Sequence, residues 1–275
     1  MEDTEFIHTK ELKEILQLLL HRYGYDFTGY AEASLLRRVN RFAKEIKSHS
    51  GYDLKYTLVN DESMFHRFVE EVTVNVTELF RDPLYYKIMR EKVLPVLASY
   101  PTIKIWHAGC STGEEVFSMC ILLHEAGLLK RARIYATDIN PANLEKAKSG
   151  IIPLRNMKEY TSNYLQSGGK NDFADYYTAR YDNALINEEL RSGIIFSQHN
   201  LVSDNVFNEF QLISCRNVMI YFNKQLQDRV LNVFYESLSS LGFLTLGLKE
   251  TLRFSTIHEK FDTIHPNVKI FRNRV

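Results

Sequence analysis

The chain has 275 residues, of which 45% are hydrophobic and 25% charged, so it is long enough to bury one large core or two modest ones. This composition excludes a disordered or low-complexity protein, and no apolar run approaches the roughly 18 to 20 residues that span a membrane. Lys+Arg and Asp+Glu are equal at 34 each. With no net charge to attract polyanions, we expect no nucleic-acid partner and no membrane insertion.

Cysteine spacing and the N-terminal residues bear on location. Cys110, Cys120 and Cys215 lie too far apart for a CxxC pair or a zinc-finger spacing, which is typical of a reduced chain. The first residues are acidic and lack the basic and apolar regions of a secretory signal, so we expect a cytoplasmic protein. Because His107 and His199 have no second ligand pattern nearby, we expect no metal.

The first 75 residues have the pattern of helices. Residues 10–21 place four leucine and isoleucine side chains on one helical stripe, and residues 31–48 repeat this pattern. We therefore expect a small all-helical domain over residues 1–75.

From Pro83 onwards, helix and strand patterns alternate. Asp82 is predicted to cap a helix that begins at Pro83 and runs to about Ala98. The elements predicted after it are strand 103–107, helix 114–126, strand 134–137 and a helix from residue 141 to Gly150. This alternation predicts an α/β fold with a doubly wound, Rossmann-like parallel sheet over residues 76–275.

The remaining elements are predicted in two groups. Strands are expected at 210–214, 243–246 and 268–271, with a helix capped by Asn223 whose apolar spacing continues to Leu238. Residues 160–195 are rich in Tyr and Asn and fit neither a crossover helix nor a short loop. We interpret this stretch as a small inserted subdomain; a long surface loop with one helix is the alternative.

A glycine-containing loop follows the first predicted strand. Ala108, Gly109, Ser111 and Gly113 allow a ligand to approach backbone N–H groups at a helix start. The loop is not GxGxxG, and Glu114 with its acidic neighbour at 115 disfavours phosphate there. Carboxylates in a first helical turn favour a ligand with cationic centres, although a purely structural tight turn is the alternative.

Asp138 ends the second predicted strand. In doubly wound folds an acidic side chain at this place can bind both ribose hydroxyls of a nucleoside. The alternative is that Asp138 only starts the next helix, since Asn140 and Pro141 follow it. Together with the glycine loop, ribose binding is the favoured interpretation.

Five ordered runs resemble one family. NVTELFRD (75–82), AGCSTGEEVFS (108–118), ATDIN (136–140), HNL (199–201) and CRNVMIYF (215–222) resemble the motifs of CheR-type chemotaxis receptor methyltransferases. That resemblance covers nearly the whole chain. It implies transfer of a methyl group from S-adenosylmethionine to receptor glutamates, with S-adenosylhomocysteine as product, and a helical domain, a methyltransferase domain and an inserted subdomain.

The resemblance also implies site residues. The positions that match the family's cofactor contacts are Asn75, Thr77, Arg81, Gly109, Glu114, Asp138, Asn200, Leu201, Arg216 and Asn217. Arg81 and Tyr221 match the residues nearest the transferred methyl. Arg81 could orient the acceptor carboxylate through its planar fork. The alternatives are an ordinary surface arginine and a buried aromatic residue.

The second predicted helix carries a basic band. Arg37 and Arg41 are spaced to share one face, and Arg38 lies beside them. The resemblance implies that such arginines dock an acidic helical bundle of a chemoreceptor or other sensory protein. A solvated face without a partner is the alternative, because Glu32 and Glu45 dilute the charge.

Two departures from the family pattern concern the substrate. Many members have His-Ser-Glu after the last glycine turn, whereas Leu248 and Lys249 replace His-Ser here. Residues 173–190 do not match the stretch with which some members bind a receptor's C-terminal peptide. Our interpretation is protein-glutamate methylation; the alternatives are a non-catalytic module that senses S-adenosylmethionine or another nucleotide, and a methyltransferase acting on a different substrate.

Overall fold

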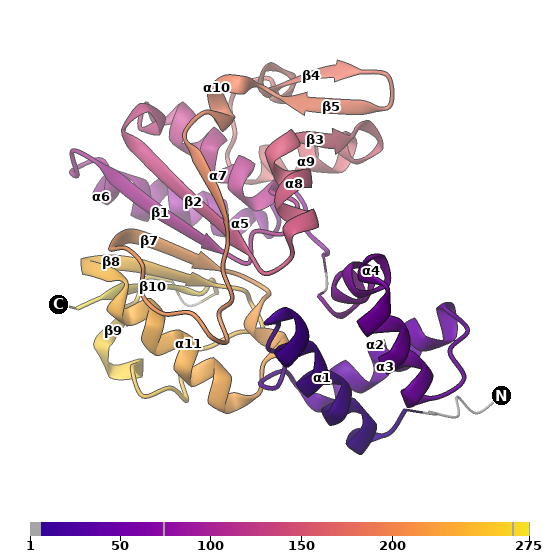
Figure 1. Cartoon of the computed structure of the whole chain (residues 1–275). Coiled ribbons are helices and arrows are strands. Elements are labelled where there is room, and N and C mark those ends of the chain that lie inside the picture. The colour runs from indigo at the N-terminus through magenta and orange to yellow at the C-terminus, as the bar shows by residue number, and fades with distance from the viewer. Residues whose placement is uncertain (1–6, 74, 266, 275) are drawn as a thin grey trace. The chain divides into compact units, whose positions relative to one another are not determined.

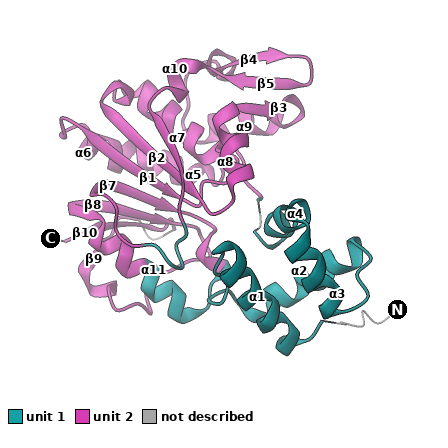
Figure 2. Ribbon diagram, in the orientation of Figure 1, with its two compact units in different colours: residues 1–75, 200–204, 221–230 teal, residues 76–199, 205–220, 231–275 magenta. Residues whose placement is uncertain are grey.

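The computed structural model describes residues 7–73, 75–265 and 267–274. The chain divides into two compact units, coloured separately in Figure 2. Unit 1 comprises residues 1–75, 200–204 and 221–230, and unit 2 comprises residues 76–199, 205–220 and 231–275. The helix α11 (Lys224–Glu236) contributes residues to both units.

Unit 1 is built on four helices: α1 (Thr9–Tyr23), α2 (Glu32–Glu45), α3 (Gly51–Asn60) and α4 (Glu62–Val72). The apolar stripes of the first two are buried, as their spacing predicts, and Phe42 packs edge-on against Phe68 with ring centroids 5.5 Å apart. Polar side chains cap the N-termini of α3 and α4. Ser50 accepts a hydrogen bond from the Asp53 backbone N–H, and Asp61 caps α4 in the same way.

Unit 2 contains a seven-stranded sheet with the order β6-β2-β1-β7-β8-β10-β9. Its strands are β1 (Ile103–Ala108), β2 (Ala132–Asp138), β6 (Ile194–Gln198), β7 (Phe210–Cys215), β8 (Leu238–Leu246), β9 (Phe261–Thr263) and β10 (Ile270–Asn273). The first five strands of that order run parallel, and β10 is antiparallel to both of its neighbours. The predicted doubly wound α/β class, with an all-helical N-terminal part, is confirmed.

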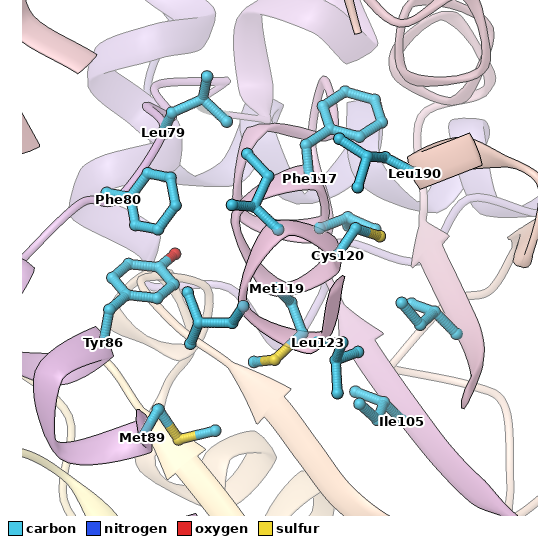
Figure 3. Packing of buried hydrophobic residues seen from close by; sticks show 14 of the residues in the cluster. Leu79, Phe80, Tyr86, Met89, Ile105, Phe117, Met119, Cys120, Leu123 and Leu190 are labelled. Atoms are coloured by element: carbon cyan, nitrogen blue, oxygen red, sulfur yellow. The ribbon is translucent and has the colours of Figure 1, made fainter. Parts of the chain in front are cut away.

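Helical segments accompany this sheet. They are α5 (Pro83–Ile88), the π-helix η1 (Met89–Val93), α6 (Leu94–Leu97), α7 (Glu114–Glu125), η2 (Leu129–Arg131), α8 (Pro141–Ser149) and η6 (His258–Lys260), besides α11 and the short η5 (Met219–Tyr221). Consecutive residues of a strand face opposite sides of the sheet. Ile105 therefore joins the cluster with Phe117 and Met89 shown in Figure 3, whereas Trp106 packs against Phe234 of α11.

A second, three-stranded sheet has the order β3-β5-β4. Its strands are β3 (Ile151–Pro153), β4 (Tyr177–Arg180) and β5 (Asn183–Ile186), and the surrounding segments are η3 (Leu154–Asn156), α9 (Met157–Gln166), η4 (Phe173–Tyr176) and α10 (Glu188–Arg191). This sheet excludes the alternative of a long surface loop. It also includes β3, which precedes the expected range 160–195.

One local expectation is wrong, and another is confirmed only in part. Leu238 has helical spacing from Phe234 but begins β8, where it pairs with Phe210 across the sheet. Asp82 does precede α5, yet its side chain makes no capping hydrogen bond. Its carboxylate instead accepts a hydrogen bond from Arg216 at 2.7 Å, because an ion pair with a buried guanidinium competes with the cap.

Candidate functional site

The turn between β1 and α7 lies at the carboxyl edge of the sheet. The backbone N–H groups of Gly109 and Cys110 both donate to the Thr137 carbonyl at the end of β2, at 2.8 and 2.9 Å. The backbone then takes positive φ at Ser111 (51°) and again at Gly113 (97°), just before α7. Ligands of open α/β folds bind at this edge of the sheet, next to a helix N-terminus.

Gly109 is the position in this turn that admits no side chain. Its φ is 77°, and a Cβ atom added there would lie 2.4 Å from Cγ2 of Val218. Gly109 thus brings the turn into contact with the segment that follows β7. The close approach and the left-handed backbone both require glycine.

Asp138 holds this turn from the end of β2. Its Oδ2 accepts the Ser111 backbone N–H at 2.9 Å, and Oδ1 accepts the Asn140 backbone N–H at 2.9 Å and the Asn143 side-chain amide at 3.2 Å. Burial raises the pKa of Asp138, and these donors oppose that shift. Asn140 caps α8, so Asp138 does help to start that helix.

Glu114 is a buried carboxylate in the first turn of α7. It accepts a hydrogen bond from Thr112 at 2.6 Å, and burial raises its pKa. Among the residues that the structure describes, neither Glu114 nor Asp138 forms an ion pair. The Oγ of Ser111 is buried without a hydrogen-bond partner in the same part of the chain. Such a corner is suited to a cationic ligand with hydrogen-bonding groups.

Glu115 binds Arg216, whose side chain is 1% exposed. Oε2 of Glu115 accepts from Nη1 of Arg216 at 3.0 Å, and Oε1 accepts from Ser214 at 2.6 Å and faces His107 Nδ1 at 3.2 Å. Burial alone would raise the pKa of Glu115, but the Arg216 charge and these hydrogen bonds lower it to about 2. The sequence pattern indicated Glu114 and did not reveal this network, because Ser214 and Arg216 are about a hundred residues from Glu115.

Arg216 was expected near the nucleoside of the cofactor. The structure commits its guanidinium to protein groups: Nη2 donates to Asp82, Nη1 donates to Glu115, and its plane lies 4.0 Å from the centroid of Tyr85. Contact between Arg216 and a nucleoside stays a prediction. Asn217, the next residue, has a φ of 63° and begins the Asn217–Met219 turn.

The predicted segment before α5 is anchored to α7. The Phe80 backbone N–H donates to Ser118 Oγ at 2.9 Å, and the half-buried Arg81 donates through Nη1 to the Val76 carbonyl at 3.2 Å. Thr77, which lies between Val76 and Phe80 in the sequence, is half-buried. Roles for Thr77 and Arg81 in binding or catalysis stay predictions.

Four predicted site residues belong to unit 1: Asn75, Asn200, Leu201 and Tyr221. Asn200 closes its own turn, since its Oδ1 accepts the Val202 backbone N–H at 3.0 Å. The Tyr221 carbonyl accepts the Ala31 backbone N–H at 2.8 Å, which fixes the backbone of Tyr221 within this unit. Unit 2 holds the other residues predicted to contact the cofactor or the transferred methyl, and the predicted docking arginines of α2 are in unit 1.

The basic band on α2 is corrected by the structure at Arg38. Its side chain is buried, Nη1 donates to the Val72 carbonyl at 2.5 Å, and its guanidinium lies 4.6 Å from the centroid of Tyr221. The spacing rule placed Arg38 beside exposed neighbours and could not show these partners. Arg37 and Arg41 are exposed, and Arg41 pairs with Glu71.

Other chemistry finds little support in the described part of the chain. No cluster of His, Cys, Asp and Glu there could hold a metal ion. All three cysteines are buried, and burial raises the pKa of each thiol, so they are poor nucleophiles. None of the helices described combines the length and apolar character needed to cross a membrane.

Two family models match this chain. A family model described as the CheR methyltransferase SAM binding domain matches residues 75–270, and one described as the CheR methyltransferase all-alpha domain matches residues 10–73. Among solved structures, the glycopeptide N-methyltransferase MtfA complexed with sinefungin is 9% identical, with a TM-score of 0.38. That match covers 62% of this chain and 50% of the solved one, so the chain spans half of that protein's length.

Relatives in sequence are more similar. A protein of Pseudomonas putida named as a methyltransferase, Cher3, is 46% identical over 262 residues, covering 95% of this chain and 96% of that protein. The chemotaxis protein methyltransferases of Listeria innocua and Salmonella typhimurium are each 30% identical, over 83% and 90% of this chain and 85% of each relative. The chain therefore belongs to the CheR family of S-adenosylmethionine-dependent chemotaxis methyltransferases.

Proposed function

We propose that this enzyme methylates glutamate side chains of chemoreceptors or related sensory proteins, forming methyl esters. The observation that carries the proposal is the buried pair of carboxylates, Glu114 and Asp138, beside the Gly109 turn; neither has a cationic partner among the described residues. S-adenosylmethionine supplies a methyl group on a positively charged sulfur, together with an ammonium group and ribose hydroxyls. An acidic corner with a close-approach glycine fits each of these groups.

Cofactor binding is assigned to residues at the carboxyl edge of the sheet. The Gly109 turn packs closely against Val218, and Ser111 Oγ is an unpartnered hydrogen-bonding group in the same turn. Asp138 binds ribose hydroxyls, and Glu114 receives the ammonium group. Thr77 and Asn217 complete the set proposed within unit 2, while Arg216 contributes by holding Glu115 and Asp82. Asn75, Asn200 and Leu201, which belong to unit 1, stay predicted cofactor contacts.

The acceptor needs no general base. A glutamate side chain has an ordinary pKa of about 4.3, so at neutral pH it is already a nucleophilic anion. Catalysis then consists of placing the carboxylate oxygen, which in model systems is worth roughly 7 to 11 kcal/mol. Arg81, which donates one N–H to the Val76 carbonyl, is assigned to orient that carboxylate, and Tyr221 is assigned to hold it or the methyl donor.

The docking partner is proposed to be an acidic helical bundle in the cytoplasm. Arg37 and Arg41 on α2 present exposed positive charge to such a surface. Arg38 is withdrawn from this set because it is buried. Its assigned contribution is to hold Tyr221 within unit 1.

One transfer assay tests the proposal. The full chain is incubated with methyl-labelled S-adenosylmethionine and membranes that contain candidate receptors, and the labelled protein band is then treated with mild base. Release of volatile methanol is expected, because methyl esters of glutamate are base-labile. Base-stable label would instead indicate a different acceptor, and cofactor binding without transfer would indicate a sensing module.

Two variants separate binding from turnover. Asp138→Ala is expected to weaken binding of S-adenosylhomocysteine in calorimetry. Arg81→Ala is expected to keep that affinity while lowering turnover. The reverse pattern would remove these two assignments.

A further inference from the structure

Glu250 is a buried carboxylate that collects four backbone N–H groups. Its Oε1 accepts from Val218 at 3.0 Å and Met219 at 2.7 Å, and its Oε2 accepts from Asn217 at 3.0 Å and Gly247 at 2.5 Å. The residue is 5% exposed. Three of the four donors come from the segment after β7, more than thirty residues earlier in the chain.

The segment after β7 starts with Asn217 at a φ of 63°, so its successive N–H groups converge on one side, as in the backbone nests that bind anions. Here the anion is a side chain of the protein. Removing it would leave several buried donors unsatisfied, each at a cost of about 1 to 3 kcal/mol.

The turn that Glu250 holds is in contact with the cofactor-binding turn. Val218 is the side chain that a Cβ at Gly109 would strike, at 2.4 Å. Arg216, on the other side of Asn217, binds Glu115 in the first turn of α7. Residues 217–219 therefore pack against the Gly109 turn, and their position limits where that turn can lie.

We infer that Glu250 is a positioning residue for the methyl-donor site: its carboxylate fixes the Asn217–Met219 turn, and that turn fixes the Gly109 turn through Val218. The inference deepens the proposed function, since the site it serves is the one that binds S-adenosylmethionine. Glu250 directly follows Leu248 and Lys249, which depart from the family pattern. Those two side chains are exposed, whereas Glu250 is buried.

The sharpest variant is Glu250→Gln. Both carboxylate oxygens accept two N–H groups, and an amide replaces one oxygen with an NH₂ group that points hydrogens at two donors. Glu259→Gln is the matched control, because Glu259 is exposed in the same β8–β9 connection. Both variants are measured in the full chain with S-adenosylhomocysteine as the probe.

Affinity for S-adenosylhomocysteine is expected to fall by about tenfold to a hundredfold in Glu250→Gln, as a displaced binding turn predicts, and to stay unchanged in Glu259→Gln. Hydrogen exchange at the Asn217, Val218, Met219 and Gly247 amides should accelerate, with the β1 and β2 amides unchanged. Unchanged affinity together with accelerated exchange would reduce Glu250 to a stabilising residue and overturn the inference.

The wild-type chain provides a test that does not depend on a variant that folds. The same four amides should exchange slowly without ligand, and amides at unprotected rates would contradict the geometry on which the inference rests. Failure of the proposed function gives a different result. In that case S-adenosylhomocysteine binds normally and Glu250→Gln weakens binding, but no base-labile methyl group appears on protein.

Discussion

Two turns at the carboxyl edge of the sheet achieve the same geometry by different means. The turn after β1 contains Gly109 and Gly113, and Asp138 from the neighbouring strand holds its left-handed residue Ser111. The turn after β7 contains no glycine, and its left-handed residue Asn217 is held by Glu250 from a distant loop. In both, a buried carboxylate accepts the N–H of a residue with positive φ.

The two turns differ in how far along the chain the residues that fix their backbone lie. In the first turn they are local, because glycine relieves the backbone and Asp138 ends the next strand along the chain. In the second they are distant, since Glu250 is in a turn that becomes adjacent only once β8 has paired with β7. Strained backbone of this kind persists only where its surroundings hold it, and it concentrates at functional sites.

The largest expected effect comes from Arg216→Ala, which breaks the tie between the two turns. The change leaves Glu115 and Asp82 without their buried cation, and breaking such a pair typically costs about 3 to 5 kcal/mol. Urea unfolding monitored by circular dichroism measures this loss. A loss below about 1 kcal/mol, as for an exposed pair, would show that the two turns are independent.

Gly109→Ala tests the contact between the turns and is expected to cost about 2 to 4 kcal/mol, from left-handed strain and overpacking against Val218 together. Gly127→Ala is the matched control, because Gly127 has a φ of 69° but no neighbour within 4 Å of an added Cβ. It isolates the strain. Unfolding midpoints and S-adenosylhomocysteine affinity are measured for both.

A double variant separates the two contributions at Gly109. Val218→Ala removes the methyl group that the new Cβ would strike, so Gly109→Ala should cost less in that background than alone. If the two changes add without coupling, the first turn does not rest on the second.

Sequence patterns predicted the fold well where burial is periodic. The stripes of α1 and α2 and the short apolar strands β1, β2 and β7 are close to their expected bounds. The pattern failed where two periodicities overlap. Leu238 continues the helical spacing of α11, yet the chain leaves the helix after Glu236 because β8 can pair with β7 there.

The site was predictable only where its information is local. The glycine turn and Glu114 follow a predicted strand and Asp138 ends the next one, so their positions could be predicted from residue order, whereas their roles stay predictions. The ties through Glu115, Arg216 and Glu250 could not, since each joins segments far apart in the chain.

The pH dependence of stability should differ in sign between these carboxylates. Glu115 has a pKa of about 2, below its ordinary value, so its contribution is present above about pH 4.3 and is lost as the pH falls toward 2. Burial raises the pKa of Asp138 and Glu250, because ionising a buried carboxyl disfavours the folded state, and the N–H donors offset only part of that cost. For these two groups the free energy of unfolding therefore decreases as the pH rises through the raised pKa.

Glu115→Gln tests the pH dependence of stability that is expected from Glu115. The variant should be less stable than wild type at pH 7, by about 3 kcal/mol, and this gap should narrow between about pH 5 and 2. Urea unfolding at a series of pH values measures the gap. A gap that is constant with pH would mean that Arg216 does not lower the pKa of Glu115.

The smallest expected effect distinguishes the two left-handed residues. Asn tolerates positive φ better than Ser, because its short polar side chain bonds locally. Ser111→Gly should therefore relieve about 1 kcal/mol of backbone strain, partly offset by the greater freedom of glycine in the unfolded chain. Asn217→Gly should relieve less strain and is opposed by the same entropy of the unfolded chain. Paired urea titrations should place Ser111→Gly above Asn217→Gly in stability. The opposite order would mean that the second turn, despite its carboxylate anchor, carries the greater backbone strain.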